Sequence, residues 1–339
     1  MSGGIGVVAA IAWIVFAAAL CAGLIAVLYP WLKRYALAKP NARSSHATPT
    51  PQGGGIAVVA AAIVTTCLAW YFSAAWSMQG ELRAVFGAVI LIACVGAADD
   101  IRPIAVVPRL LLQAFAVALV IYALPAELRV VPYLPWWIER VLLVAGGLWF
   151  VNLVNFMDGL DWMTVVEVVP ITGALVAIGA LGELPPQALV AALALGGAMI
   201  GFAYFNRPVA RLFLGDVGSL PIGLLLGWLL LMLAARGHLV AAIVLPLYYL
   251  ADATVTLLRR LAYGEMIWQA HRMHFYQRAT DRGFAVTEIV GWVFAVNIGL
   301  SALAVLTVMA PGRLSEIAAL LGAVILVAGL LFAFARGGK

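Results

Sequence analysis

Two amides and two carboxylates follow one another along a short stretch near the middle of the chain, at Asn152, Asn155, Asp158 and Asp161. On a helix, the first three stand at intervals of three residues, so neighbouring members share a face. The stretch directly follows the apolar run 141–151. Polar groups at membrane depth are costly unless they meet a partner or a water-filled cavity. The stretch alone therefore predicts either a capped helix end or part of a site.

A second acidic group, the adjacent pair Asp99 and Asp100, follows another apolar run. Neighbouring carboxylates repel one another, which raises the pKa of at least one of them unless a cation or donor compensates. The pair is suited to act as a general base or as a partner of a metal-bound substrate. The structural alternative is a helix end that Arg102 stabilises.

A third acidic position, Asp216, lies between Gly215 and Gly218, which leave room for a ligand to approach the carboxylate. Asp216 also falls where the next apolar run begins, so capping of a helix N-terminus is the structural alternative. Oxygen donors without a matching Cys/His set favour a hard cation, and Mg²⁺ completes its shell with substrate phosphates and water. We expect Asn155 and Asp216 to hold Mg²⁺, for which Mn²⁺ could substitute.

Basic side chains gather in the segment 271–278, which contains His271, Arg272, His274 and Arg278. If the segment is helical, His271, His274 and Arg278 lie on one side of it. No cysteine or HExxH pattern accompanies the histidines, and the arginines favour an anion such as a diphosphate. An amphipathic segment lying on anionic lipid is the competing interpretation.

The polar segment 39–55 offers two more donors for a diphosphate, Arg43 and His46. It ends in the triplet Gly53–Gly55, at the start of an apolar run. Backbone N–H groups at a helix start attract anions, so the triplet could approach a phosphate. Taken alone, the triplet is better explained by close packing of the backbone.

The elements that must position these side chains are membrane-spanning helices. The 339 residues are 65% hydrophobic and only 10% charged, and apolar runs long enough to cross a bilayer recur from end to end. No soluble domain can be separated, so we predict one all-α transmembrane domain, 1–339. The predicted crossings, eleven in all, are 5–29, 56–73, 83–98, 108–124, 138–155, 163–181, 187–204, 218–235, 239–258, 286–308 and 315–335.

Eleven crossings place the two termini on opposite faces, and the basic residues decide the orientation. Of the 20 Lys and Arg residues, fifteen fall in the carboxyl tail and in alternate loops beginning with 30–55, and five fall on the other side. All seven aspartates lie in, or near the helix ends that face, the loops that hold these fifteen basic residues. Asp252, inside the ninth crossing, is either an ion-pair partner or a functional group. We therefore predict an external amino terminus, a cytoplasmic carboxyl terminus and chemistry on the cytoplasmic face.

In this order, the polar segments resemble those of the polyprenyl-phosphate N-acetylhexosamine-1-phosphate transferases, of the glycosyltransferase family 4 type. That family includes the muramoyl-pentapeptide transferase of peptidoglycan synthesis and the enzymes that start O-antigen chains. The resemblance covers roughly residues 5–335 and rests on four motifs, which are Asp99-Asp100, Asn152 to Asp161, Leu214 to Ser219, and His271 to Arg278.

The resemblance implies transfer of a sugar 1-phosphate from a UDP-N-acetylhexosamine to undecaprenyl phosphate, with release of UMP, an EC 2.7.8 type of reaction. It implies a bacterial inner-membrane protein with a periplasmic amino terminus, acting at the first membrane step of O-antigen or another cell-surface polysaccharide. By the same resemblance, Asn155 and Asp216 hold Mg²⁺ with Asp158 close by. Asp99 and Asp100 orient or deprotonate the lipid phosphate, and Asp99 is the expected base.

Donor binding is implied for the histidine and arginine cluster. The sequence His271-Arg272-Met273-His274 departs from the H-x-H-H-H pattern of the muramoyl-pentapeptide and N-acetylglucosamine branches. It looks more like the enzymes that accept UDP-N-acetylfucosamine or UDP-N-acetylquinovosamine, and UDP-N-acetylglucosamine stays open. A homodimer would fit the family. The expected substrate-binding residues are Asn152, Asp161, Arg43, His46, His271, Arg272, His274 and Arg278.

Two functions from other classes compete with a transferase. A secondary transporter should carry ionisable groups near the bilayer midplane, matching halves and broken helices. The sequence has no detectable internal repeat, and most aspartates stand at predicted helix ends, which favours an enzyme. A non-catalytic scaffold would not need a carboxylate pair, a glycine-flanked aspartate and a His/Arg cluster on one face. No basic patch with interleaved aromatic residues predicts nucleic-acid binding.

Overall fold

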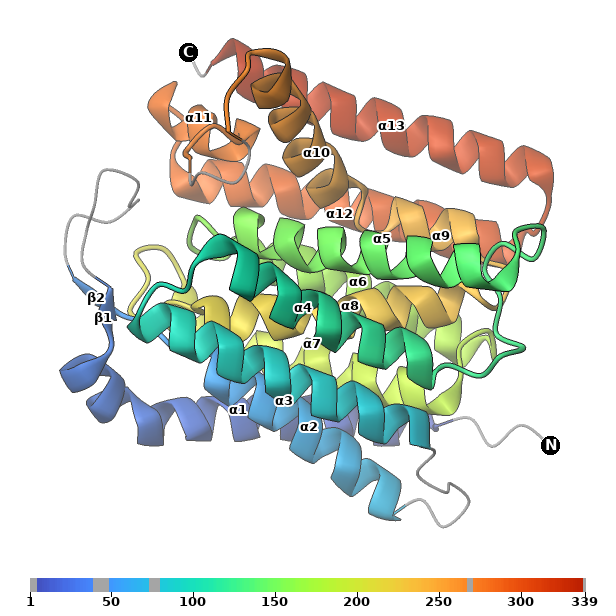
Figure 1. Ribbon diagram of the computed structural model, residues 1–339, viewed down its shortest axis with the longest axis horizontal. Coiled ribbons are helices and arrows are strands. Elements are labelled where there is room, and N and C mark those ends of the chain that lie inside the picture. Colours follow the sequence, from blue (N-terminus) through green and yellow to red (C-terminus); the bar gives the residue numbers. More distant parts are fainter. Residues whose placement is uncertain (1–4, 39–48, 73–79, 267–270, 338–339) are drawn as a thin grey trace.

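Long apolar helices run side by side in the computed structural model, which describes residues 5–38, 49–72, 80–266 and 271–337 (Figure 1). The only strands in this part of the chain are two residues long, and they pair antiparallel in the first loop. The all-α fold class is thereby confirmed. The elements are α1 (Val7–Tyr35), β1 (Leu37–Ala38), β2 (Thr50–Pro51), α2 (Gly55–Phe72), α3 (Gly80–Ile101), α4 (Val106–Ala123), α5 (Trp136–Met157), α6 (Met163–Ala180), α7 (Pro186–Asn206), α8 (Asp216–Ala234), α9 (Leu239–Val244), α10 (Leu247–Ala262), α11 (Phe275–Asp281), α12 (Val286–Met309) and α13 (Arg313–Arg336).

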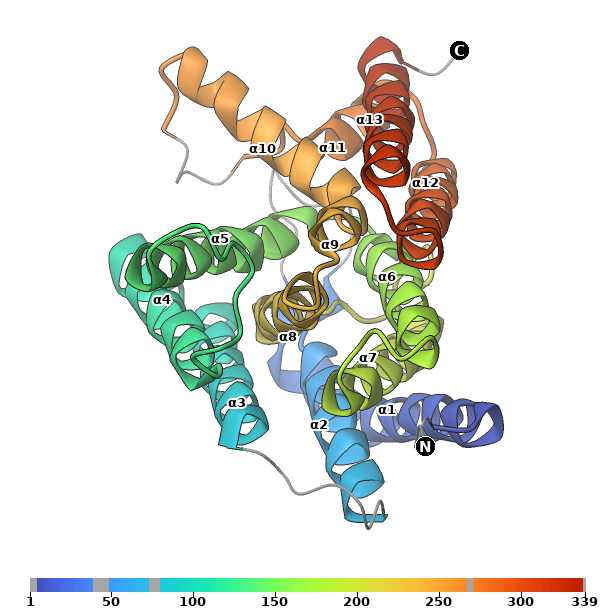
Figure 2. The same cartoon turned by 90° about the vertical axis from the view of Figure 1, so that its right-hand side faces the viewer.

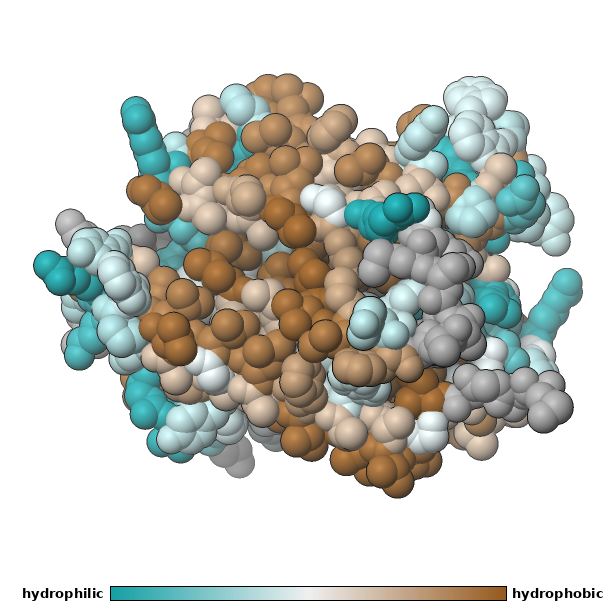
Figure 3. Space-filling model, turned by 90° about the horizontal axis from the view of Figure 1, so that it is seen from below, coloured by the Kyte–Doolittle hydropathy of each residue, from teal (hydrophilic) through white to brown (hydrophobic). Residues whose placement is uncertain are grey.

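Ten of the described helices are long and apolar enough to cross a membrane. On the face shown in Figure 3, apolar side chains form a broad band across the middle, and hydrophilic side chains gather at the two ends. The start of α1 and the end of α13 lie at opposite ends of the bundle (Figure 1). Which end faces the cytoplasm stays a prediction from the basic residues.

The predicted ninth crossing, 239–258, is wrong as a continuous helix. The chain forms the short helix α9, breaks at Leu245 and Pro246, and continues as α10 in a different direction (Figure 2). Proline has no N–H to donate and its ring clashes with the preceding turn, so a helix commonly breaks there. The remaining ten predicted crossings correspond to the ten long helices, with ends shifted by up to six residues.

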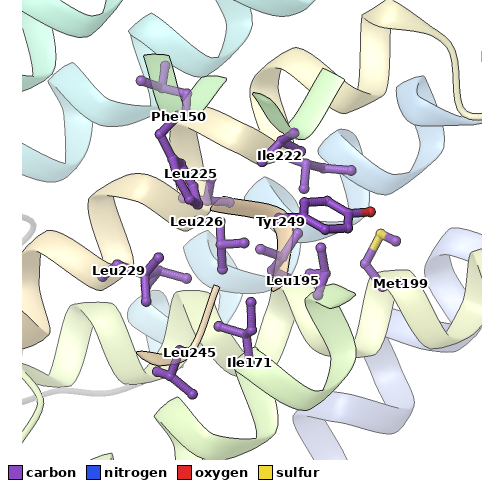
Figure 4. Packing of buried hydrophobic residues seen from close by; sticks show 14 of the residues in the cluster. Phe150, Ile171, Leu195, Met199, Ile222, Leu225, Leu226, Leu229, Leu245 and Tyr249 are labelled. Atoms are coloured by element: carbon purple, nitrogen blue, oxygen red, sulfur yellow. The ribbon is translucent and has the colours of Figure 1, made fainter. Parts of the chain in front are cut away.

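Helix α8 forms the centre of the bundle, surrounded by α2, α3, α5, α6 and α7 (Figure 2). Sixteen of its 19 residues are buried, as expected for a helix that is apolar on all sides. Leu225, Leu226 and Leu229 of α8 pack against Phe150 of α5 and Ile171 of α6 (Figure 4). These contacts place α8 in the hydrophobic core of the bundle.

Glycines allow two neighbouring helices to reach the first turns of α8. A Cβ atom on Gly55 of α2 would lie 2.1 Å from the Cα atom of Gly218, and one on Gly96 of α3 would lie 2.3 Å from the carbonyl oxygen of Asp216. Neither space can hold a side chain, because backbone atoms fill it. This close approach brings the end of α3 directly beside Asp216.

Candidate functional site

Four of the predicted site residues meet where α3 and α5 end and α8 begins. Asp99 and Asp100 lie in the last turn of α3, rather than in the following loop as predicted, while Asn155 lies in the last turn of α5 and Asp216 is the first residue of α8. The amide nitrogen of Asn155 donates to Asp216 Oδ1 at 2.8 Å and to the hydroxyl of Ser219, also at 2.8 Å. Residues far apart in sequence thus form one polar cluster.

Asp100 caps the first turn of α8. Its carboxylate accepts hydrogen bonds from the backbone N–H groups of Asp216 and Val217, each at 3.0 Å, and from the side-chain amide of Gln52. Gly215 allows this approach, since a Cβ there would stand 2.6 Å from Asp100 Oδ2. The N-terminus of a helix favours such a negative charge. The capping that the sequence suggested for Asp216 is therefore performed by Asp100.

Asp99 is held on three sides. Its carboxylate accepts from the backbone N–H of Ile104 at 2.6 Å and forms an ion pair with Arg109 at 2.7 Å. Arg109 thus occupies the place that the sequence suggested for Arg102. Asp99 also contacts the carboxyl group of Asp216 at hydrogen-bonding distance. Two carboxyl groups so close require a shared proton or a cation.

The donor set fits a hard cation that binds together with phosphates. The oxygens of Asp99 and Asp216 adjoin one another, and the Asn155 amide lies against Asp216. Among the described residues, no three His, Cys, Asp or Glu side chains converge closely enough to hold a metal ion by themselves. Mg²⁺ commonly needs only one or two protein carboxylates when phosphates complete its shell. The cluster therefore suits Mg²⁺ bound with a diphosphate, with the Asn155 amide turned to present its oxygen.

Asp158 ends α5 beside this cluster. It accepts a hydrogen bond from the hydroxyl of Thr164. Burial, and then repulsion from the nearby carboxylates of Asp100 and Asp161, raise the pKa of Asp158 from 3.8 to about 7. A carboxylate with this pKa can accept and release a proton near neutral pH. Asp158 thus has the electrostatic setting of a general base.

Asn152 and Asp161, both predicted to bind substrate, make hydrogen bonds within the chain, and their role in binding stays a prediction. Asn152 is buried in α5 and donates to Gln113 of α4 at 2.8 Å. Asp161 is also buried and accepts from the backbone N–H of Ala210 at 2.9 Å, which ties the loop after α7 to the end of α5. Asn206 joins the same two segments, since its side-chain oxygen accepts from the backbone N–H of Trp162 at 2.8 Å. The sequence did not single out Asn206.

The glycine triplet serves packing. The N–H groups of Gly53 and Gly54 donate to the carbonyl oxygen of Phe213, and that of Gly55 donates to Leu214. All three donors are thereby occupied by the chain itself, so the suggested contact with a phosphate is not supported. Arg43 and His46, predicted to bind a diphosphate, lie outside the described residues.

The histidine cluster adopts a different conformation from the predicted one. Helix α11 begins only at Phe275, so His271 and His274 precede it and do not lie at helical spacing. Their rings nevertheless contact one another, with centroids 4.9 Å apart. The ring of His274 also lies 6.5 Å from that of Phe156, next to Asn155. His274 thus lies against the end of α5, and His271 lies beside it.

Asp252, whose role the sequence left open, holds this arrangement together. It is fully buried in α10 and accepts from the backbone N–H groups of Phe275 at 2.9 Å and Tyr276 at 3.2 Å, which caps α11. The same carboxylate lies 3.3 Å from Nδ1 of His274. A carboxylate in this position fixes the orientation of the imidazole ring. The sequence marked Asp252 as an intramembrane ionisable group but gave no sign of partners more than twenty residues away.

Tyr276 attaches α11 to the end of α5. Its hydroxyl donates to the carbonyl oxygen of Phe156 at 3.0 Å and accepts from the backbone N–H of Gly159. A Cβ on Gly159 would lie 2.2 Å from this hydroxyl. The left-handed residue of this turn is Trp162, with φ of 63°. Gly159 is needed for the approach of Tyr276.

Arg272 and Arg278, both predicted to bind the donor, lie in different surroundings. Arg272 donates to the hydroxyl of Thr280 at 3.0 Å and lies 3.6 Å from Asp281. Arg278 lines a small pocket with Arg259 and Arg260 at the end of α10. Three guanidinium groups around one pocket suit an anion. No contact joins Arg272 or Arg278 to the carboxylate cluster in the described structure.

An apolar groove runs along the bundle between α4, α5, α8, α9 and α10. Its walls include Val117, Gly147 and Trp228, and Pro246 lies where α9 and α10 break. Nearly all of its lining side chains are apolar. A groove of this character fits a hydrocarbon chain.

Comparisons with known proteins relate these features to a family. The family described as Glycosyl transferase family 4 matches residues 82–234, which contain the carboxylates at 99, 100, 158 and 216. A probable undecaprenyl-phosphate N-acetylglucosaminyl 1-phosphate transferase of Bacillus subtilis is 23% identical over 293 residues, 80% of each chain. A phospho-N-acetylmuramoyl-pentapeptide-transferase of Gluconacetobacter diazotrophicus is 29% identical over 76% of this chain and 79% of the relative. A decaprenyl-phosphate N-acetylglucosaminephosphotransferase of Mycobacterium leprae is 26% identical over 82% of this chain and 78% of the relative.

Proposed function

Because the chain belongs to glycosyl transferase family 4, the polyprenyl-phosphate N-acetylhexosamine-1-phosphate transferases, we propose that it joins an N-acetylhexosamine 1-phosphate to a polyprenyl phosphate. The donor is a UDP-sugar, the acceptor is undecaprenyl phosphate, and UMP is released. The observation that carries the proposal is the cluster at the end of the bundle, where Asn155, Asp99 and Asp216 adjoin one another. It offers oxygen donors for a cation beside an apolar bundle.

The reaction is a phosphoryl transfer, in which positioning and charge neutralisation supply most of the rate. An oxygen of the lipid phosphate attacks the β-phosphorus of the donor, and the bridging oxygen leaves with UMP. Mg²⁺ at Asn155 and Asp216 would neutralise charge on the diphosphate. His274 lies against Phe156 at the end of α5 with His271 beside it, and we propose that both donate to the diphosphate.

We assign the proton acceptor to Asp158 rather than to Asp99. The oxygens of Asp99 are engaged by Ile104 and Arg109, which suits a positioning role. Asp158 has Thr164 as its hydrogen-bond donor, and its pKa is raised to about 7. A phosphate monoester needs only a weak base to lose its last proton near neutral pH.

The apolar groove supports a lipid acceptor. It lies among α4, α5, α8, α9 and α10, and α5 and α8 both reach the polar cluster. A polyprenyl chain in the groove would keep its tail among apolar side chains while its phosphate meets the carboxylates. The fifteen-to-five distribution of Lys and Arg supports a cytoplasmic site, where nucleotide sugars are available.

The finer assignment is a donor of the N-acetylfucosamine or N-acetylquinovosamine type, with UDP-N-acetylglucosamine as the competitor. It rests on the sequence His271-Arg272-Met273-His274. The corresponding pathway would be the first membrane step of O-antigen or another surface polysaccharide in a bacterial inner membrane. The relatives are named for N-acetylglucosamine and muramoyl-pentapeptide substrates, which belong to the same reaction type.

A secondary transporter remains the alternative, and one observation favours it. The break between α9 and α10 is the kind of interrupted helix that transporters use at their binding sites. The clustering of Asp99, Asn155 and Asp216 at one end of the bundle, rather than at its middle, supports the transferase.

The decisive experiment measures UMP release by the purified protein with undecaprenyl phosphate, Mg²⁺ and a panel of UDP-N-acetylhexosamines. We expect release with one donor, loss of release in EDTA, and a decrease of about a hundredfold or more in Asp216→Ala and Asn155→Ala. Glu127→Gln is the matched control, because Glu127 is exposed in the loop between α4 and α5. Release that survives EDTA would contradict the metal assignment. Folded protein that releases no UMP with any donor would contradict the transferase itself.

A further inference from the structure

Helix α10 carries polar side chains towards the protein and apolar side chains outward. Its buried side holds Asp252, Thr256 and Arg260, which follow one another at intervals of four residues. Its outer side holds Leu258 and Leu261, whose exposed fractions are 60% and 59%. Beyond its first turns, α10 runs outward from the bundle (Figure 2). A helix with this pattern suits contact between its outer side and the hydrocarbon of a bilayer.

The last turn of α10 lies where the membrane-spanning helices end. Helix α11 follows it in the chain and is attached to the last turn of α5, because the hydroxyl of Tyr276 donates to the carbonyl oxygen of Phe156 at 3.0 Å. The buried carboxylate of Asp252 joins α10 to α11, since it accepts from the backbone N–H of Phe275 at 2.9 Å. Lipid headgroups lie at the level where membrane-spanning helices end, directly outside the hydrocarbon core. The space between α10 and α11 can therefore meet a lipid headgroup.

Three guanidinium groups line one small pocket in this space, those of Arg259 and Arg260 from α10 and that of Arg278 from α11. Arg260 is held within the chain, where it donates to the carboxylate of Glu265 at 2.7 Å. The guanidinium of Arg259 lies 5.6 Å from the centroid of the Phe275 ring. In the part of the chain that the structure describes, no carboxylate forms an ion pair with Arg259 or Arg278.

The charges around this pocket are unbalanced, because three guanidinium groups line it and only one of them is paired with a carboxylate. The arginines stand in the last turns of α10 and α11, where the helix dipole favours a positive charge. The dipoles do not explain why both helix ends direct arginines at the same pocket. Guanidinium groups repel one another, and the low dielectric of a nearby bilayer strengthens the repulsion. An anion with several oxygens, such as a phosphate, relieves it by accepting from more than one guanidinium.

We propose that Arg259, Arg260 and Arg278 form a binding site for the phosphate of an anionic membrane lipid, apart from the cluster of Asp99, Asn155 and Asp216. The acyl chains of the lipid then lie along the apolar outer side of α10, and its phosphate joins α10 to α11. The proposal does not depend on the proposed function, because the lipid is a ligand here and not a substrate. It gives Arg278 a role other than the donor binding that the sequence predicts.

The test is binding of phosphatidylglycerol to the purified full-length protein, measured by native mass spectrometry, with zwitterionic phosphatidylcholine as the reference lipid. We expect the wild type to prefer phosphatidylglycerol. At about fivefold for each arginine lost, Arg259→Gln combined with Arg278→Gln should weaken its binding about tenfold to thirtyfold. Arg207→Gln combined with Arg211→Gln is the matched control, since these exposed arginines lie over the ring of Tyr204, in the loop between α7 and α8. The control should keep its affinity within about twofold.

A change in the opposite direction comes from Glu265→Gln. This variant removes the negative charge beside the pocket and keeps an oxygen that can accept from Arg260, so phosphatidylglycerol should bind about fivefold more tightly. A loosened fold would not produce tighter binding, so this variant tests the site even where the double variant fails to fold. Binding no tighter than that of the wild type would contradict the charge argument.

Three other results would overturn the proposal. An equal loss of phosphatidylglycerol binding in both double variants would show that surface charge alone attracts the lipid. Weaker binding of the UDP-sugar by Arg278→Gln, with phosphatidylglycerol binding unchanged, would place Arg278 in the donor site. Inorganic phosphate that displaces phosphatidylglycerol at equal concentration would show that the pocket takes soluble phosphates. Folded protein that releases no UMP would refute the proposed function and leave the lipid-binding result unaffected.

Discussion

The substitution Asp100→Asn separates a structural role from a chemical one. The Asp100 carboxylate accepts hydrogen bonds from the N–H groups of Asp216 and Val217, each at 3.0 Å, and from Gln52. An asparagine in its place keeps one acceptor oxygen but turns an NH₂ group towards one of these donors. We therefore expect the variant to lose stability at the start of α8.

The magnitude follows from three contributions. One lost hydrogen bond to a charged acceptor costs about 1.5–3 kcal/mol. Loss of the negative charge at the N-terminus of α8 costs a further 0.3–1 kcal/mol or so. Relief of repulsion from Asp99 offsets roughly 1 kcal/mol of this. The free energy of unfolding should decrease by about 1–3 kcal/mol.

The assay is SDS-induced unfolding of the purified protein, with hydrogen exchange of the Asp216 and Val217 amides as the local measurement. Asp281→Asn is the control, because the Asp281 side chain is 57% exposed and the change should stay within about 0.5 kcal/mol. An Asp100→Asn variant as stable as the wild type, or more stable, would refute the capping role. That outcome would mean that relief of repulsion dominates, as expected for a group retained only for chemistry.

Three further predictions concern the neighbourhood of the same cluster. Without Mg²⁺, the free energy of unfolding should fall by up to about 4 kcal/mol as pH rises from 4 to 8, because ionising Asp158, whose pKa is raised to about 7, costs free energy in the folded state only. Asp158→Asn should flatten this slope and abolish UMP release, and an unchanged slope would contradict the assignment. Gly159→Ala would bring a Cβ within 2.2 Å of the Tyr276 hydroxyl, so it should lower the free energy of unfolding by about 1–3 kcal/mol and raise the KM for the donor. Adding Tyr276→Phe should recover part of the lost stability. Gly218→Ala would place a Cβ 2.6 Å from a backbone Cα of α2 and should cost about 3 kcal/mol in SDS unfolding, whereas Gly146→Ala, with open space around its Cβ position, should be neutral within about 1 kcal/mol.

The carboxylate and amide motifs were predictable in their convergence but not in their pairing. The sequence indicated that Asp99, Asp100, Asn155 and Asp216 stand at helix ends on one face, because each follows or precedes an apolar run of membrane-spanning length. It gave no means of knowing that Asp100, rather than Asp216, caps α8. That choice depends on the close approach of α3 to α8 at Gly96, which is a property of three-dimensional packing.

The break in the ninth predicted crossing escaped prediction for a related reason. Prolines at positions 30, 170 and 221 lie inside continuous helices, whereas Pro246 follows a break. Local sequence does not separate these cases, because a proline kink becomes a break only where other groups satisfy the freed backbone.

The placement of the anion-binding groups follows from how the helix starts are used. The N–H groups that could receive a phosphate are already occupied, at α2 by the carbonyl oxygens of Phe213 and Leu214, at α8 by Asp100 and at α11 by Asp252. At two of these three helix starts the acceptor is a carboxylate, which adds negative charge where a diphosphate would bind. The positive charge that a diphosphate needs must then come from side chains and from a bound cation. This is the physical reason to expect that removing Mg²⁺ abolishes binding of the UDP-sugar as well as turnover, which equilibrium binding of the donor with and without EDTA would measure.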